Sequence, residues 1–210
     1  MVPSVPVSRV PRRPPRPDDP VEAVRRWYEN ELGWAAVPGS PVRLVTGLRF
    51  DVLEVPAEAG FPGLRHLGPA SPVALHGERM RLLVAAGSAE ELPGLLDWLE
   101  WGALALDLTA IGAGGSIEAP PPPDPGVVVA PDPGTRETRR GPRGAARWLR
   151  PPEPGRAVEP ALPALSALGG GAVGGGVGNA PDLVRLVQTM ATHCHRVKLR
   201  RACAQPLAFS

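Results

Sequence analysis

The chain has 210 residues, of which 43% are hydrophobic, and a formal net charge of +2. This length suits one ordinary domain, and the charge is too small to indicate a nucleic-acid partner by itself. No stretch approaches the roughly 20 apolar residues of a transmembrane helix, and the proline-broken start lacks the apolar run of a secretory signal. We therefore expect a cytoplasmic protein with no membrane contact.

Proline and glycine are numerous and bunched, with 29 prolines and 25 glycines. Residues 1–17 are rich in proline and arginine and are expected to form a disordered tail. A helix is predicted over residues 20–32, because Asp19 can cap it, Pro20 suits its first position and Gly33 can end it.

Branched and aromatic residues predict a sheet in the next part of the chain. The sequence PVRLVTGLRFDVLEVP at 41–56 indicates two short β segments on either side of a turn at Thr46–Gly47. The second segment, at 49–55, is expected to be central. A hairpin with arms at 71–77 and 79–86 would bring the sheet to at least four strands.

Two helices are expected to accompany these strands, one at 57–66 and one at 88–101 with Ser88 as its cap. Residues 105–123 then read as a strand, a glycine-rich turn, a second strand and a proline stop. The turn, GAGGS at 112–116, lacks the lysine of a phosphate-binding loop and the helix that should follow, so a turn between strands is favoured.

In the C-terminal third, segments without predicted secondary structure alternate with segments that have it. Residues 121–145 are predicted to be a disordered insertion, 147–149 a short final strand and 162–168 a short helix. The glycine run at 169–180 is typical of a flexible linker, and a last amphipathic helix is predicted over 181–203.

The last helix has two distinct sides. Its predicted apolar stripe consists of Leu183, Leu186, Val187, Met190, Cys194 and Val197. Its polar side consists of Arg185, Gln188, Thr192, Arg196 and Arg200. Cys194 and Cys203 are nine residues apart on this helix, about 13 Å, which is too far for a disulfide.

These elements together predict the α+β class: a small mixed or antiparallel sheet flanked by helices. The folded domain is expected to span residues 18–168 apart from the insertion, with the last helix beyond the linker.

Three segments, in order, carry a resemblance to a known family. They are LVTGLRFDVLEVPAEAG, ERMRLLVAAG and LDLTAIGAGGSIEAPPP, and they span about residues 42–123. Their turns, acids and apolar triplets resemble the N-terminal domain of bifunctional DNA primase-polymerases. The resemblance implies that family's α+β fold and a two-metal nucleotidyl-transfer site.

Four positions correspond to the family's site. Glu54 matches the first metal acid and Asp107 the third, whereas Pro56 stands where the second acid belongs and Arg81 where a histidine belongs. Residues three apart on a strand point to opposite sides, so Asp51 cannot join Glu54 on one ion without a bulge. The expected catalytic and metal residues are therefore vestigial: Glu54 and Asp107.

Each of these residues also has a simpler interpretation. Glu54 is more commonly a strand carboxylate paired with a neighbouring arginine, and Arg81 a surface arginine. For Asp107 the two interpretations are even. An arginine at a site of this kind can instead hold a phosphate. The candidate phosphate or nucleic-acid contacts are Arg79, Arg81, Arg196, Lys198, Arg200 and Arg201.

Other ligand-type residues have structural explanations. His193, Cys194 and His195 point about 100° apart on a helix, so a zinc site shared with Cys203 is disfavoured. The tryptophans are more typical of core or interface packing than of base stacking: Trp27, Trp34, Trp98 and Trp101.

The sequence leads to three hypotheses. The first is a non-catalytic primase-polymerase-like domain that binds DNA, a nucleotide or a protein partner, with no cofactor. The second is an active nucleotidyl transferase that uses Glu54, Asp107 and, if a bulge turns it to the same face, Asp51, together with Mg²⁺. The third is an interaction protein that docks on a partner through the C-terminal helix.

Overall fold

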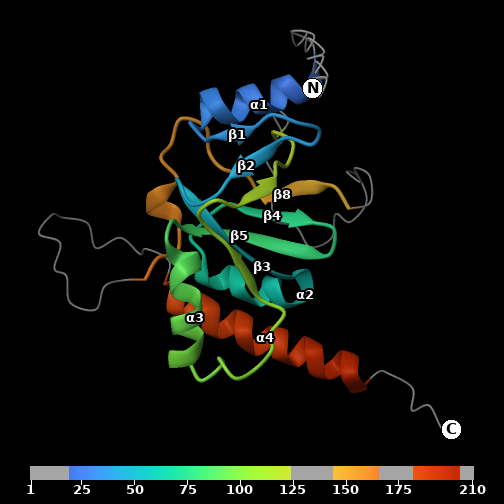
Figure 1. Cartoon of the computed structure of the whole chain (residues 1–210), viewed down its shortest axis with the longest axis vertical. Coiled ribbons are helices and arrows are strands. Elements are labelled where there is room, and N and C mark those ends of the chain that lie inside the picture. Colours follow the sequence, from blue (N-terminus) through green and yellow to red (C-terminus); the bar gives the residue numbers. More distant parts are fainter. Residues whose placement is uncertain (1–18, 124–143, 166–181, 204–210) are drawn as a thin grey trace, which may run out of the picture.

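The computed structural model describes residues 19–123, 144–165 and 182–203. The described chain forms four layers, which Figure 1 shows from top to bottom. Helix α1 (Pro20–Glu31) covers a small sheet, the small sheet lies on a larger one, and helices cover the far face of the larger sheet. The predicted α+β class is confirmed. The tail at 1–17, most of the insertion at 121–145 and the linker at 169–180 fall outside the described residues.

Helix α1 begins and ends as the sequence predicts. The side chain of Asp19 accepts a hydrogen bond from the Val21 amide at 3.0 Å, and Pro20 occupies the first turn. Tyr28 is fully buried under the helix, where its hydroxyl donates to the Pro120 carbonyl at 2.6 Å. The same hydroxyl accepts from Nε1 of Trp148 at 3.0 Å, so α1 is tied to both sheets.

In the described residues, eight strands form two sheets in which every pair of neighbours is antiparallel. The small sheet has the order β1 (Ala36–Val37), β2 (Arg43–Val45), β7 (Ser116–Glu118). The larger sheet has the order β6 (Thr109–Ile111), β3 (Phe50–Pro56), β5 (Arg79–Ala85), β4 (Val73–His76), β8 (Ala146–Arg150). The predicted hairpin is β4–β5, and the predicted strand at 147–149 lies within β8. Strand β3 is an inner strand as expected, although β5 holds the middle.

The predicted turn at Thr46–Gly47 does not pair the two strands that it joins. It carries the chain from β2 in the small sheet to β3 in the larger one. Gly47 has a φ of 87° and lies directly against the backbone of Ala113, where a Cβ would be 2.7 Å from the Ala113 nitrogen. Only glycine fits this turn without strain, because an L-residue is disfavoured at that φ and its Cβ has no room.

Four helical elements lie on the far face of the larger sheet. They are α2 (Ala57–Gly60), the 3₁₀ helix η1 (Phe61–His66), α3 (Ser88–Trp98) and α4 (Leu183–Cys203). The predicted helix at 57–66 is thus divided between α2 and η1. Pro62 explains the division, because it has no amide hydrogen with which to continue an α-helical ladder.

Helix α3 differs from its prediction at both ends. Ser88 is buried rather than capping, Gly87 is the cap residue, and the carboxylate of Asp51 on β3 accepts from the Ala89 amide at 2.9 Å. At the other end, Glu100 adopts a left-handed φ of 64°, which ends the helix before the predicted residue 101.

The predicted short helix at 162–168 is wrong for the residues that the structure describes. A 3₁₀ turn, η2 (Glu159–Ala161), comes before it, and Leu162 is extended with a ψ of 134°. Pro163 is the cause, because a residue before proline is disfavoured in the helical region. The Pro163 carbonyl then accepts from the Ala85 amide at 2.9 Å, at the end of β5.

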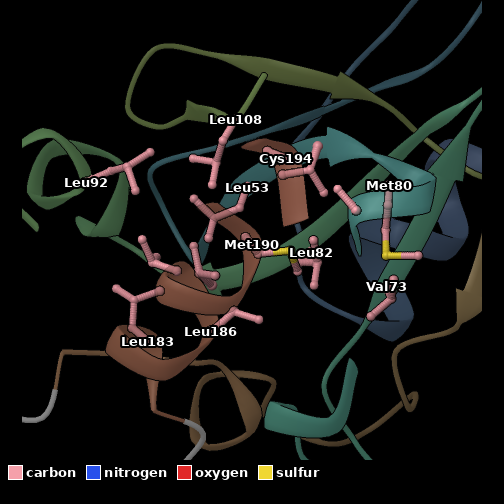
Figure 2. Packing of buried hydrophobic residues seen from close by; sticks show 14 of the residues in the cluster. Leu53, Val73, Met80, Leu82, Leu92, Leu108, Leu183, Leu186, Met190 and Cys194 are labelled. Carbon is pink, nitrogen blue, oxygen red and sulfur yellow. The ribbon is translucent and has the colours of Figure 1, made fainter. Parts of the chain in front are cut away.

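Helix α4 completes the larger core. Asp182 accepts from the Val184 amide at 2.9 Å, and the helix follows as predicted. Its whole apolar stripe is buried against β3, β4, β5 and α3, as Figure 2 shows for Leu183, Leu186, Met190 and Cys194. A second core, on the other face of the larger sheet, lies beneath the small sheet and α1 and includes Tyr28, Trp34, Phe50 and Leu83.

None of the helices in the described part of the chain has the length and apolar character that crossing a bilayer requires.

Candidate functional site

Four of the eight predicted site residues, Glu54, Arg79, Arg81 and Asp107, meet in a line of polar side chains, which we call the charged row. It consists of Asp107, Arg79, Glu54, Arg81, His76 and Glu118. Glu54 on β3 lies directly opposite Arg81 on β5. Arg79 is two residues from Arg81 and therefore lies on the same face of the sheet. This is the face that the small sheet covers in part.

Glu54 is the centre of the charged row. Its carboxylate accepts from Nε of Arg81 at 2.7 Å and from Nε of Arg79 at 3.2 Å. Arg79 also donates to the carboxylate of Asp107, just before β6. Arg79 thus lies between the two acids that the resemblance assigns to metal binding.

The interpretation of Arg81 as a surface arginine is wrong. Arg81 is only 8% exposed, because β5 is the middle strand of the larger sheet and the small sheet covers part of this face. Its Nη2 meets Nδ1 of His76 at 3.1 Å, and its Nη1 has no hydrogen-bond partner among the described residues.

The contact with Arg81 fixes the state of His76. Arginine has no acceptor atom, so Nδ1 of His76 must accept and the ring proton lies on Nε2. Nε2 faces the carboxylate of Glu118 on β7 at 3.4 Å. Along the row, the carboxylates of Glu54, Asp107 and Glu118 thus lie beside two guanidiniums and one imidazole.

The electrostatics of the row favour ion pairing. Burial works to raise the pKa of the Glu54 carboxyl, but the hydrogen bonds and charges of Arg81 and Arg79 together hold that pKa below its ordinary value. Burial likewise works to lower the pKa of Arg79, and Asp107 and Glu54 outweigh it. The carboxylates of Glu54 and Asp107 already have guanidinium partners, so a divalent cation at Glu54 would compete with two arginines.

Asp51 points away from the charged row, as the strand geometry predicts. It is 1% exposed on the α3 side of the larger sheet, where it caps that helix. Its second oxygen, Oδ1, has no partner among the described residues. Because Pro56 and Arg81 also offer no carboxylate, Glu54 and Asp107 are the only matched acids on this face.

The remaining candidate phosphate contacts lie on the opposite side of the larger sheet. Arg196, Lys198, Arg200 and Arg201 are exposed on α4. Lys198 donates to the Ala105 carbonyl at 2.9 Å, and Arg200 pairs with Glu58 on α2 at 2.6 Å. The structure therefore divides the predicted phosphate contacts into two groups, with Arg79 and Arg81 in the charged row and the other four on α4.

A groove lies between α4 and η1, with a volume of about 340 Å³. It is lined by Arg65, Gln188, Thr189, Thr192, His193 and Arg196. Sequence analysis missed Arg65, because the contact between η1 and α4 joins segments more than 100 residues apart. The only signal available was the unusual composition of 183–203, which holds five lysines and arginines and no acid.

The histidine and cysteine cluster does not converge. Cys194 is buried in the larger core, where desolvation and the nearby Asp107 raise the pKa of its thiol to about 12, while Cys203 is exposed. Both thiols are free. Within the described ranges no group of three or more histidine, cysteine or acidic side chains is placed to hold a metal ion.

Trp27, Trp34, Trp98 and Trp101 differ in how far they are buried. Trp34 is buried in the second core, as expected, and Trp27 packs edge-on against Tyr28. Trp101 rests against α4, where its Nε1 donates to Oε1 of Gln188 at 3.0 Å. Trp98 is 69% exposed, so it does not pack in the core of this chain, and interface packing stays a prediction for that residue.

Comparison of the chain with protein-family models, with curated proteins and with solved structures gave no match.

Proposed function

We propose that the chain is a non-catalytic, primase-polymerase-like domain that binds nucleic acid through backbone phosphates, and that α4 supplies the contacts. The observation that carries this proposal is the composition of α4. Its apolar stripe is buried, and what it exposes is basic or neutral without a single acid. Such a surface favours polyanions, because each neutralised phosphate releases condensed counterions.

The charged row supports the non-catalytic part. Polymerase chemistry requires carboxylates that converge on two divalent ions. Here Arg79 donates hydrogen bonds to both Glu54 and Asp107, and Arg81 donates to Glu54. Pro56 stands where the second acid belongs. The row is built as a set of ion pairs that joins β3, β5 and the segment before β6.

The same arrangement removes Arg79 and Arg81 from the list of phosphate contacts. Each already donates to a carboxylate, and Arg81 is buried. A phosphate would have to displace Glu54 to reach either arginine. The exposed basic residues of α4 face no such competition, apart from the pairs that Arg200 and Arg185 make with Glu58 and Asp182.

A protein partner that docks on the apolar stripe of α4 is less well supported. Leu186, Val187 and Met190 are all fully buried in the core of the same chain. The stripe is therefore already covered, and the exposed Leu199 is a single apolar side chain among basic ones rather than a face for the helix-in-groove mode of recognition.

The test is binding of the full chain to labelled single- and double-stranded DNA at several salt concentrations, with Mg²⁺ and nucleotide extension scored in parallel. We expect salt-dependent binding without extension. The variant Arg196→Gln/Arg201→Gln should flatten the plot of log affinity against log salt by about one to two units. The matched control is Arg26→Gln/Arg43→Gln, which removes the same charge from α1 and β2, on the far side of the molecule.

Two results would overturn the proposal. Extension that is lost in Glu54→Gln or Asp107→Asn would show a working polymerase. Affinities that are the same for the α4 variant and the control would show that α4 is not the interface.

A further inference from the structure

We propose that the groove between α4 and η1 is a seat for one phosphodiester group, held between the guanidiniums of Arg65 and Arg196. This assignment deepens the proposed function and rests on it. It turns a diffuse basic surface into a defined contact, and it adds a residue from η1 to the interface.

The groove has the volume of a ligand site, and all of its lining residues are polar. Its volume of about 340 Å³ is within the range of small-molecule sites, roughly 300 to 1,000 Å³. Its residues come from two elements that are firmly packed together. Gly63 on η1 lies against Met190 and Leu186 of α4, and His66 contacts Oγ1 of Thr189 at 2.9 Å. Arg65 on η1 and Arg196 on α4 both line this groove.

The two arginines differ from their basic neighbours in their partners. Arg185 pairs with Asp182 at 3.4 Å, and Arg200 pairs with Glu58 at 2.6 Å. In the described part of the chain no carboxylate lies within ion-pair distance of Arg65 or Arg196. Nε of Arg65 donates to Nε2 of His66 at 3.1 Å, which leaves its two terminal nitrogens for a ligand. A guanidinium presented in this way suits bidentate contact with phosphate oxygens.

Gln188 supplies a neutral donor to the same groove. Its Oε1 accepts from Nε1 of Trp101, so its amide nitrogen is the group left to donate. The Thr192 hydroxyl donates to the Gln188 carbonyl at 2.8 Å and is therefore already used. The donors that remain for an anion are those of Arg65, Arg196, Gln188 and His193.

The imidazole of His193, which can take up a proton, lines the groove. Desolvation and the charges of Arg196, Arg65 and Arg200 hold the pKa of its imidazole below the ordinary value. The charged groups around it are Arg196 and Arg200 on α4, Arg65 on η1, and Glu58 on α2, which is paired with Arg200. His66 of η1 also has a lowered pKa, through desolvation and then Arg65 and Arg185.

A bound phosphodiester would reverse part of this effect. Negative charge in the groove favours the imidazolium form of His193, so binding takes up a proton and tightens as pH falls through the histidine range, below about 6.5. The phosphodiester keeps its single charge throughout that range, so the pH dependence reports on the protein.

The experiment is titration of the full chain with a short oligothymidylate, followed by NMR of the His193 imidazole and by fluorescence anisotropy at pH 7.5 and pH 5.5. We expect Arg65→Gln to weaken binding by about tenfold or more, as for loss of a hydrogen bond to a charged group. Arg65→Lys should restore part of the loss, and Arg26→Gln on α1 should have little effect. His193→Gln should remove the gain in affinity at the lower pH.

Three outcomes would overturn the assignment while leaving the proposed function intact. The first is that Arg65→Gln weakens DNA binding no more than Arg26→Gln does. The second is that the oligothymidylate leaves the His193 NMR signals unmoved. The third is that the gain in affinity at the lower pH persists in His193→Gln. Dimethyl phosphate separates the two proposals in the other direction. If it shifts the His193 signals in a chain that does not bind DNA, the seat exists and the proposed function fails. If inorganic phosphate fills the groove and the oligothymidylate cannot displace it, the seat belongs to a free phosphate ester and the phosphodiester assignment fails.

Discussion

Replacement of Glu54 by glutamine tests whether the charged row is a structural ion pair or a metal site. Glu54 is only 18% exposed at its side chain and accepts two charge-assisted hydrogen bonds, from Arg81 and Arg79. Glutamine keeps one neutral acceptor but leaves the buried Arg81 without an opposing charge. Hydrogen bonds to charged groups contribute about 1.5 to 3 kcal/mol each, so we expect Glu54→Gln to cost about 2 to 3 kcal/mol of unfolding free energy.

Asp107→Asn provides the contrast. The Asp107 carboxylate is 48% exposed and meets only Arg79, which keeps Glu54 as a partner. A solvent-exposed pair of this kind contributes less than about 1 kcal/mol. The two acids, equivalent in the resemblance, should therefore differ at least twofold in their effect on stability.

The assay is urea unfolding at pH 7, followed by tryptophan fluorescence and circular dichroism. With a slope of about 2 kcal/mol/M, Glu54→Gln should lower the midpoint by about 1 M and Asp107→Asn by less than about 0.5 M. Carboxylates held together for an absent cation repel each other, so neutralising one of them should stabilise the metal-free protein. A rise in the midpoint for Glu54→Gln would therefore refute the ion-pair reasoning.

Three further outcomes follow from the same structure. The pKa of Glu54 is lowered from 4.5 in the folded state, so its contribution to the free energy of unfolding is present above that value and is lost as pH falls below it. In urea titrations at acid pH, the unfolding midpoints of wild type and Glu54→Gln should therefore converge. Gly47→Ala should lower the free energy of unfolding by about 3 kcal/mol or more, since the new Cβ would meet the Ala113 backbone. Gly114 has a φ of 75° and open space around it, so Gly114→Ala should cost only about 1 kcal/mol. Thermal melts compare the two variants. In a thiol-reagent assay at pH 8, one cysteine should react quickly and Cys203→Ser should remove that reaction, because Cys194 is buried with a pKa of about 12; two fast thiols would contradict this packing.

The elements that could be predicted from the sequence are those with local signals. Helix α1 has an Asp19 cap and a proline start, and α4 has a sustained apolar stripe. Strands β4 and β5 were predicted because a Gly77–Glu78 turn joins two apolar runs. In each case the information lies within a few neighbouring residues.

The failures arise where distant residues decide the structure. Nothing near Ser88 reveals that the carboxylate capping α3 comes from Asp51, 38 residues away. The burial of Arg81 depends on a second sheet that the sequence did not separate from the first. For the site, pairing of Glu54 with a neighbouring arginine was one of the alternatives, but the identity of Arg81 as that partner and the bridge from Arg79 to Asp107 require the β3–β5 register to be known.

One segment of the chain is shared by the two sheets. Strand β6 lies at an edge of the larger sheet and β7 at an edge of the small one, yet only residues 112–115 separate them. The Gly115 carbonyl accepts from Thr46 where the chain crosses between the sheets a second time, at 3.1 Å. The chain thus crosses between the two sheets twice at one corner, and neither sheet can be separated from the other without cutting both crossings. Efforts to divide this protein should therefore keep residues 43–118 as one piece.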